Sequence, residues 1–186
     1  TLNDLILPDH LSDELRQIVV ETRKRDLLEE KGLHPRRRLL FSGPPGTGKT
    51  LSAEALAGEL KFPLFTVLLH GLITKFMGET AQKLRLIFDA IRTTRGVYLF
   101  DEIDALVGDT LIAVLRQLRA GYPKRPQFFP QSVVLCGVRD VRDYRIHSSR
   151  DKEIITGGSA FNIKAKSLRM GDFDPEDVQL LYGQHT

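Results

Sequence analysis

The sequence predicts an α/β fold in which helices cover both faces of a mainly parallel sheet. Short apolar runs alternate along the chain with segments whose apolar residues recur at helical spacing. Parallel strands need long crossover connections, and helical crossovers lie on the faces of the sheet. With 186 residues, the chain is long enough for one domain with a sizeable core and too short for two. We therefore expect residues 1–186 to form a single core domain.

Helix signals open the chain and a buried strand follows. Ser12 and the two acids after it are typical of a helix start, and Gly32 is a natural helix end. The apolar run 39–42 ends in glycine and proline, as a buried strand of a parallel sheet does. The next segment, 51–60, is rich in Ala, Leu and Glu and predicts a helix.

The same alternation continues through the middle of the chain. It predicts a strand over 62–69, a helix over 79–94 and a third strand over 96–100. A third helix is expected over 109–119, because Gly121 can end it.

The last third of the chain is less regular. A fourth strand is expected over 132–138 and a weaker, more polar fifth strand over 161–168. The polar stretch 142–158 predicts a loop or an irregular insertion. Asp174 is expected to cap a last helix over 175–182.

Composition bounds the functions that the chain can have. Apolar residues make up 41% and charged residues 27% of the chain, as in a soluble globular protein. No apolar run reaches the roughly 18 residues of a membrane span, and the first residues lack a signal-peptide layout. The single cysteine, Cys136, lies in an apolar run, so no disulfide within the chain is possible and a buried thiol is expected. We expect a cytoplasmic protein without a membrane partner.

The basic residues form three local clusters, although the net charge is only +3. They cover residues 36–38, 139–145 and 164–169. Nucleic-acid binding needs such charges, but no aromatic stacking pattern accompanies them. We expect solvated faces or anion sites, and no nucleic-acid partner.

The strongest motif is the glycine-rich loop from Gly43 to Thr50, which matches the pattern G-x-x-x-x-G-K-[ST]. Glycines let the backbone curl so that several N–H groups point into one concavity and hold phosphate oxygens. The helix that follows adds the positive end of its dipole. Lys49 is expected to contact the β- and γ-phosphates, and the Thr50 hydroxyl to bind Mg²⁺. The predicted nucleotide-binding residues here are Pro45, Gly46, Thr47, Gly48, Lys49, Thr50 and Leu51.

Two acids follow the third predicted strand. Asp101 and Glu102 come directly after four apolar residues. The carboxyl ends of neighbouring parallel strands share one edge of the sheet, so Asp101 is expected near the phosphate loop as a second Mg²⁺ ligand. Glu102 is expected to polarise the attacking water as a general base. Asp104 is interpreted as a helix cap or a solvated acid.

Residues 5–107 resemble an AAA ATPase module of the AAA+ superfamily. The resemblance rests on the lead-in 6–9, the phosphate loop 43–50 and the strand end 100–104. It implies a three-layer αβα P-loop NTPase fold with strand order 5-1-4-3-2, and ATP or ADP with Mg²⁺ as ligands. It also implies that Ile6, between Leu5 and Leu7, lines the adenine pocket. The segment 75–80 is similar to the family's first pore loop, although Phe76 and its neighbour can equally pack in the core.

The pattern changes after residue 107. The second half, 108–186, resembles AAA-like and STAND-type P-loop ATPases, which carry an arginine after the fourth strand; here this is Arg139. That resemblance implies a catalytic role for Arg139 at the γ-phosphate, although a surface ion pair is the alternative. No helical lid and no arginine finger is recognisable. The two halves suggest an engineered chimera of two ATPases, with a natural divergent protein as the alternative.

These observations leave three functions to compare. The first is ATP hydrolysis by a slow, monomeric ATPase. The second is a binding module or engineered scaffold that folds, and can bind nucleotide, without turnover. The third is remodelling of a macromolecule through a ring, which would need self-association.

Overall fold

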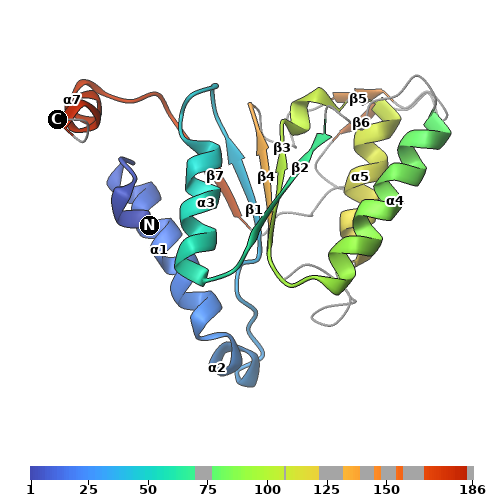
Figure 1. Cartoon of the computed structure of the whole chain (residues 1–186), viewed down its shortest axis with the longest axis horizontal. Coiled ribbons are helices and arrows are strands. Elements are labelled where there is room, and N and C mark those ends of the chain that lie inside the picture. Colours follow the sequence, from blue (N-terminus) through green and yellow to red (C-terminus); the bar gives the residue numbers. More distant parts are fainter. Residues whose placement is uncertain are drawn as a thin grey trace.

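The computed structural model describes residues 1–69, 77–106, 108–121, 132–138, 145–147, 154–156 and 166–183. Within these ranges the chain forms a five-stranded parallel sheet between two layers of helices (Figure 1). The strands of this sheet are β1 (Arg38–Ser42), β2 (Leu64–Leu68), β3 (Val97–Asp101), β4 (Ser132–Gly137) and β7 (Lys166–Arg169). Their spatial order, β2-β3-β4-β1-β7, confirms the predicted order 5-1-4-3-2, with β7 as the fifth strand.

Helices connect or flank these strands. The α-helices are α1 (Asp9–Arg23), α2 (Arg25–Glu30), α3 (Lys49–Leu60), α4 (Met77–Thr93), α5 (Gly108–Gly121) and α7 (Pro175–Gly183). Two short 3-10 turns are η1 (Leu2–Asp4) and η3 (Ile103–Ala105). None of the helices in the described ranges is long and apolar enough to cross a membrane.

The interior strand β1 joins segments that lie far apart in the sequence. It pairs in parallel with β4 on one side, with Leu40 opposite Leu135, and with β7 on the other, with Leu40 opposite Ser167. Residues of β1, β3 and β4 are buried on both faces because helices cover both, which explains their continuous apolar runs. The sheet therefore brings the ends of β1, β3 and β4 to one edge.

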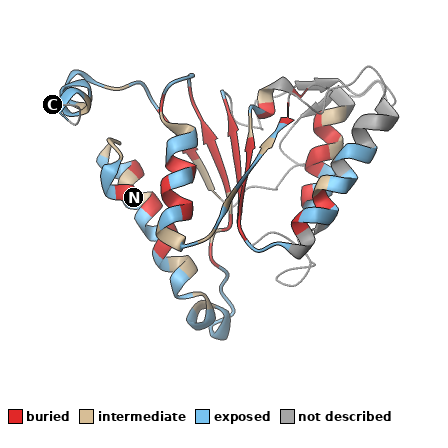
Figure 2. Ribbon diagram, viewed as in Figure 1, coloured by how far each residue is buried: buried red, intermediate tan, exposed pale blue. Residues whose placement is uncertain are grey.

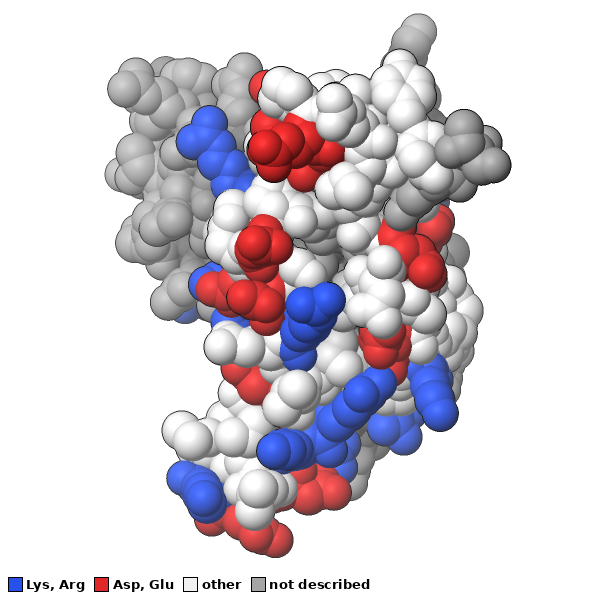
Figure 3. All heavy atoms as spheres, turned by 90° about the vertical axis from the view of Figure 1, so that its left-hand side faces the viewer, with Lys and Arg blue, Asp and Glu red and all other residues white. Residues whose placement is uncertain are grey.

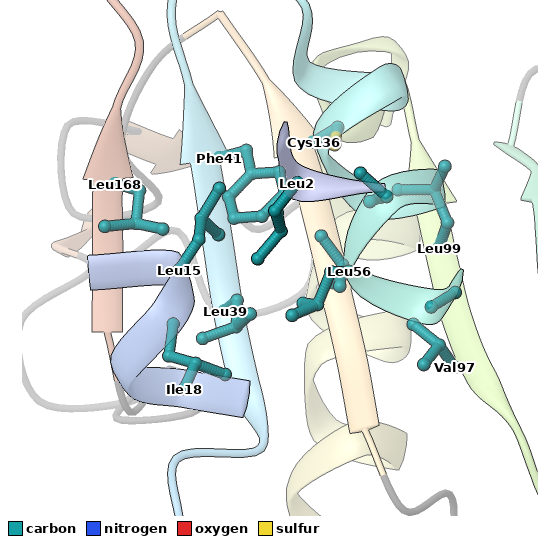
Figure 4. Packing of buried hydrophobic residues seen from close by; sticks show 14 of the residues in the cluster. Leu2, Leu15, Ile18, Leu39, Phe41, Leu56, Val97, Leu99, Cys136 and Leu168 are labelled. Carbon is teal, nitrogen blue, oxygen red and sulfur yellow. The ribbon is translucent and has the colours of Figure 1, made fainter. Parts of the chain in front are cut away.

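Two apolar cores lie on the two faces of the sheet (Figure 2). On one face α1 and α3 pack against the sheet; Leu15 and Ile18 of α1 and Leu56 of α3 point toward Leu39 and Phe41 of β1 (Figure 4). On the other face α4 and α5 cover β3 and β4, with the rings of Phe88 and Phe100 stacked at 6.0 Å. These cores fix β1 and β3, from which the site is built.

The first helix differs from its prediction at both ends. It begins at Asp9 rather than near Ser12, because the carbonyl of Pro8 accepts from the N–H groups of Leu11 and Ser12 at 2.9 and 3.1 Å. A proline at a helix start loses no hydrogen bond, since the first N–H groups have no partner within the helix. The helix also breaks at Lys24, so a second helix ends before Gly32, which has φ of 71°.

The other strands and helices agree with their predictions to within a few residues, with two differences. The stretch 142–158, expected as a loop or irregular insertion, contains an antiparallel strand pair, β5 (Arg145–His147) and β6 (Ile154–Thr156). The fifth strand of the main sheet is described at Lys166–Arg169, so only the last part of the predicted 161–168 is confirmed. Residues 161–165, the tip of the pore-loop-like segment at Phe76, and Arg139 lie outside the described residues.

Candidate functional site

A cleft of about 490 Å³ lies at the carboxyl edge of the sheet. It is lined by four loop residues (Pro45, Gly46, Lys49, Thr50), three acids at and just after the end of β3 (Asp101, Glu102, Asp104), and residues 136–138 at the end of β4. Three segments that are distant in the sequence therefore meet here, because β3, β4 and β1 are neighbours in the sheet. Ligands of open α/β sheets bind at this edge.

The loop before α3 holds its shape through its own backbone. Gly43, Gly46 and Gly48 have φ values of 151°, 84° and 77°, which side chains rarely adopt. The N–H of Gly43 donates to the carbonyl of Gly137 at 3.1 Å, and the Thr47 hydroxyl donates to the carbonyl of Pro44 at 2.9 Å. The loop is thus braced at both ends, with the start of α3 directly behind it.

The ammonium group of Lys49 lies folded against this loop. Its Nζ donates to the carbonyl oxygens of Gly43 and Pro44 at 2.8 and 2.5 Å. The positive charge therefore sits beside the concavity that the sequence predicts for phosphate. A polyanion that enters the loop can take over these two hydrogen bonds.

Thr50 and Asp101 bring the loop and β3 into direct contact. The Thr50 hydroxyl donates to Oδ2 of Asp101 at 3.3 Å, although the two residues are far apart in the sequence. A hydroxyl and a carboxylate oxygen are hard ligands, which suit Mg²⁺. Within the described ranges no group of three or more His, Cys, Asp or Glu could hold a metal ion. A pair of protein ligands agrees with a Mg²⁺ ion that takes its other ligands from phosphates and water.

Glu102 has an unusual backbone conformation at the mouth of the cleft. Its φ of 55° and ψ of 45° place it in the left-handed region, which costs a residue with a side chain about 1–3 kcal/mol. Its N–H donates to Oδ1 of Asp101 at 3.1 Å, so the strained turn also fixes the Asp101 carboxylate. Such strain is found where structure is held for function. The turn exposes the Glu102 side chain beside the cleft.

Asp104 has a role that the sequence did not predict. It neither caps a helix nor points only to solvent: its Oδ2 accepts from the N–H of Val138, at the end of β4. A Cβ on Gly137 would lie 2.7 Å from the same oxygen, so glycine is needed for this close approach. The partner is a backbone N–H on another strand, so no side-chain pattern signals it; the glycine before Val138 is the one available hint.

Cys136 forms part of the inner wall of the cleft. Its side chain is buried, as predicted. Burial and the negative charge of Asp101 raise the pKa of the thiol to about 12, while the charge of Lys49 acts in the opposite direction. The thiol is therefore protonated at neutral pH, and it is not a nucleophile.

Four predicted ligand residues are not among those that line the cleft; Thr47 and Gly48 belong to the loop itself, and Leu51 and Ile6 lie outside it. Leu51 is on α3 with 59% of its surface exposed, and it is not a lining residue. Ile6 is half-buried, between Leu5 and Leu7, which pack against the core on the α1 side of the sheet. The roles of Leu51 and Ile6 therefore stay predictions, as does that of Arg139.

The geometry of this loop and acid pair agrees with the comparison with known families. The model of the ATPase family associated with various cellular activities (AAA) matches residues 39–136, more than half of the chain. The chain belongs to the AAA family. The core from β1 to β4 is thus an ATPase core of the AAA type.

Curated relatives of this AAA domain are larger proteins. An uncharacterized AAA family ATPase of Sinorhizobium fredii is 45% identical over 104 residues, which cover 56% of this chain and 32% of the relative. The proteasome-activating nucleotidase of Aeropyrum pernix is 41% identical over 101 residues, which cover 52% and 25%. The chain spans about a third or less of the length of these relatives.

A solved structure has the same fold over almost the whole chain. The AAA domain of FIGL-1 in complex with ADP has a TM-score of 0.69 and 23% identity, and the match covers 97% of this chain and 59% of that one. At this identity the likeness establishes the fold alone. The fold likeness extends beyond the family match, to residues after 136.

Proposed function

We propose that this AAA domain binds ATP with Mg²⁺ in the 490 Å³ cleft and hydrolyses the γ-phosphate slowly. The observation that carries the proposal is the 3.3 Å contact between the Thr50 hydroxyl and Asp101. It joins the phosphate loop to the acidic strand end, which the reaction needs at one place.

The loop supplies the phosphate site. The residues from Gly46 to Thr50 carry backbone N–H groups at the start of α3, where the positive end of the helix dipole favours a polyanion. Lys49 exchanges its bonds to the carbonyls of Gly43 and Pro44 for bonds to phosphate oxygens. The ordered loop needs little rearrangement, because its glycines already have their left-handed angles.

The acids supply the chemistry around the γ-phosphate. Thr50 and Asp101 would hold Mg²⁺, which neutralises charge on the phosphate oxygens when bound. Glu102 orients a water molecule and accepts its proton as the water oxygen bonds to the γ-phosphorus. The bond from that phosphorus to the bridging oxygen breaks, and ADP leaves with phosphate. The Glu102 side chain is exposed at the mouth of the cleft, whereas the Asp101 carboxylate accepts from Thr50, and the two acids would have separate tasks.

Three further residues complete the proposed site. Arg139 follows β4, whose last residues line the cleft, and it would stabilise charge on the γ-phosphate. Ile6 and Leu51 would contact the nucleotide outside the phosphate loop. Ile6 lies just before α1, between Leu5 and Leu7, which pack against the core on the α1 side of the sheet.

We propose a monomer with low turnover in the cytoplasm, with nucleotide as its ligand and no nucleic-acid partner. An arginine finger from a neighbouring subunit raises the rate of such enzymes by orders of magnitude, and the sequence has no recognisable finger. The alternative is a binding module or engineered scaffold that holds nucleotide without turnover. The strained Glu102 favours the enzyme, because a binding module needs no such cost.

We also propose that residues 1–107 and 108–186 have different ancestry, as in an engineered chimera. A natural protein with both halves in one chain would refute the chimera.

Phosphate release by the wild type and by Glu102→Gln tests the enzyme. We expect slow, Mg²⁺-dependent release that falls at least about a hundredfold in the variant, the usual contribution of a general base. Calorimetry with ATP and Mg²⁺ is the second measurement, and here the variant should bind as the wild type does. Equal background release by both proteins would refute hydrolysis, and binding that survives Lys49→Ala would refute the phosphate site.

A further inference from the structure

A second cavity, of about 190 Å³, lies at the opposite edge of the sheet from the nucleotide cleft. Four arginines line it: Arg23 and Arg25 at the junction of α1 and α2, Arg37 just before β1, and Arg95 just before β3. We call it the arginine cavity. Figure 3 shows that most Lys and Arg side chains on this face of the protein gather in its lower part, around the end of α1 and α2.

Carboxylates accompany three of the four guanidinium groups. Arg23 contacts Glu59 at 3.2 Å, Arg25 contacts Asp26 at 3.0 Å, and Arg37 contacts Glu29 at 3.1 Å. Of these acids, only Asp26 also lines the cavity. The described residues around it therefore combine four positive charges with three negative ones.

Arg95 supplies the excess charge. It forms no ion pair with a carboxylate in the described ranges, and its Cζ lies 4.7 Å from the centre of the Phe62 ring. This cation–π contact attracts the guanidinium to the face of the ring. Phe62 lines the same cavity, which places the Arg95 guanidinium at its wall.

Arg37 adds a charge that is removed from water. Its side chain is only 8% exposed, while that of Glu29, its partner, is 41% exposed. A buried cation gains more from a nearby anion than an exposed one does, because the surroundings screen the charge less. The hydroxyl of Ser132, which is also buried, lines the cavity and is a further donor.

We propose that the arginine cavity binds a phosphate-type oxyanion, independently of the nucleotide cleft. The fork of a guanidinium matches the spacing of two phosphate oxygens, and several forks that meet in one cavity can hold a tetrahedral ion from different sides. A volume of 190 Å³ is that of about six water molecules, enough for such an ion with part of its hydration shell. The site connects α1, α2 and the strand starts, so a bound anion would hold these segments together.

Titration with inorganic phosphate, followed by NMR of the arginine Nε–H signals, tests the site. We expect saturable shifts at Arg95 and Arg37 in the wild type and in Lys49→Ala, in which the phosphate loop is disabled. Arg95→Gln should weaken this binding about tenfold or more, the loss of one charged hydrogen bond. Arg16→Gln is the matched control: it removes the same charge from an exposed pair with Asp13 on α1, outside the cavity, and should bind phosphate as the wild type does.

Each other outcome contradicts the proposal. Shifts that disappear in Lys49→Ala and persist in Arg95→Gln would show that the loop is the only phosphate site. An equal loss in Arg95→Gln and Arg16→Gln would show a general effect of charge. Acetate at the same ionic strength is the second ligand; if it produced the same shifts with the same affinity, the cavity would not select a phosphate-type ion. None of these outcomes depends on ATP hydrolysis.

Discussion

Replacement of Gly43 by alanine tests how the phosphate loop is built into the sheet. A Cβ at this position would lie 2.1 Å from the carbonyl oxygen of Met170. That carbonyl belongs to the residue directly after β7, whose N–H donates to the carbonyl of Ser42 at 2.7 Å. The backbone cannot move away without loss of this bond, so the added methyl group must distort the junction of β1, β7 and the loop.

The expected cost has two parts. A side chain at φ of 151° costs about 1–3 kcal/mol in backbone strain, and an extra methyl group in a filled space costs about another 1–3 kcal/mol. The sum, about 2–6 kcal/mol, is a large fraction of the roughly 5–15 kcal/mol by which domains are stable. We expect the free energy of unfolding to fall by this amount.

Two other glycines serve as matched controls. Gly48 has φ of 77° but no atom within 4 Å of an added Cβ, so Gly48→Ala should carry the strain alone, about 1–3 kcal/mol. Gly58 lies within α3, also with open space around it, and Gly58→Ala should stabilise the protein by about 0.5–1 kcal/mol. The order of stability is then Gly58→Ala, wild type, Gly48→Ala and Gly43→Ala.

Urea unfolding followed by far-ultraviolet circular dichroism measures all four proteins. The midpoints should separate in this order with similar slopes, since the surface exposed on unfolding does not change. Equal stability of Gly43→Ala and Gly48→Ala would refute the close approach of the loop to Met170. Equal stability of Gly43→Ala and the wild type would refute the geometry of the loop itself.

Three further predictions concern single side chains. Asp104→Ala should lower the free energy of unfolding in urea by about 1 kcal/mol and slow phosphate release, because the Val138 N–H loses its acceptor. Asp104→Asn should restore both the stability and the rate. Equal effects of the two substitutions would contradict the role of that hydrogen bond. Alkylation of Cys136 should occur only as the protein unfolds, because burial raises the pKa of the thiol to about 12. The stability that depends on the neutral thiol should be present below pH 9 and be lost as the pH rises toward 12. Rapid alkylation of the folded protein at pH 7 would contradict this prediction. The hydrogen bond from Lys166 lowers the pKa of Glu14 despite the opposing effect of burial, so the stability that it gives is present above the ordinary pKa of 4.5 and is lost as the pH falls. When the pH is lowered, Lys166→Met should therefore lose less stability than the wild type. Equal losses in the two proteins would contradict the pairing.

The phosphate loop and the sheet could be predicted because local sequence determines them. Apolar runs such as 39–42 mark strands that are buried on both faces, and the loop with its lysine is an unbroken sequence motif. The meeting of Thr50 with Asp101 followed from strand order, since the ends of parallel strands share an edge. Asp174 also caps α7 as expected, and accepts from the N–H groups of Glu176 and Asp177 at 2.9 and 2.8 Å.

The features that were missed depend on contacts between distant backbone atoms. The early start of α1 comes from the carbonyl of Pro8, and the role of Asp104 from the N–H of Val138. Neither partner has a side-chain signature. The arginine cavity was visible only as scattered basic residues, because Arg37 and Arg95 come together through the order of β1 and β3 in the sheet, with β4 between them. The three basic clusters that the sequence shows, at residues 36–38, 139–145 and 164–169, do not include Arg95.

The position of β1 between two strands that come later in the sequence has a consequence for synthesis of the chain. Its partners, β4 and β7, leave the ribosome only after residues 132–137 and 166–169 are made. Until then the run Leu39-Leu40-Phe41 has no neighbour to pair with, and unpaired apolar strands are prone to aggregate. The sheet can therefore be completed only after residue 169 is made, and pairing between such distant segments is slow. A nascent chain that ends before residue 166 leaves β1 as an open edge, a natural target for chaperones.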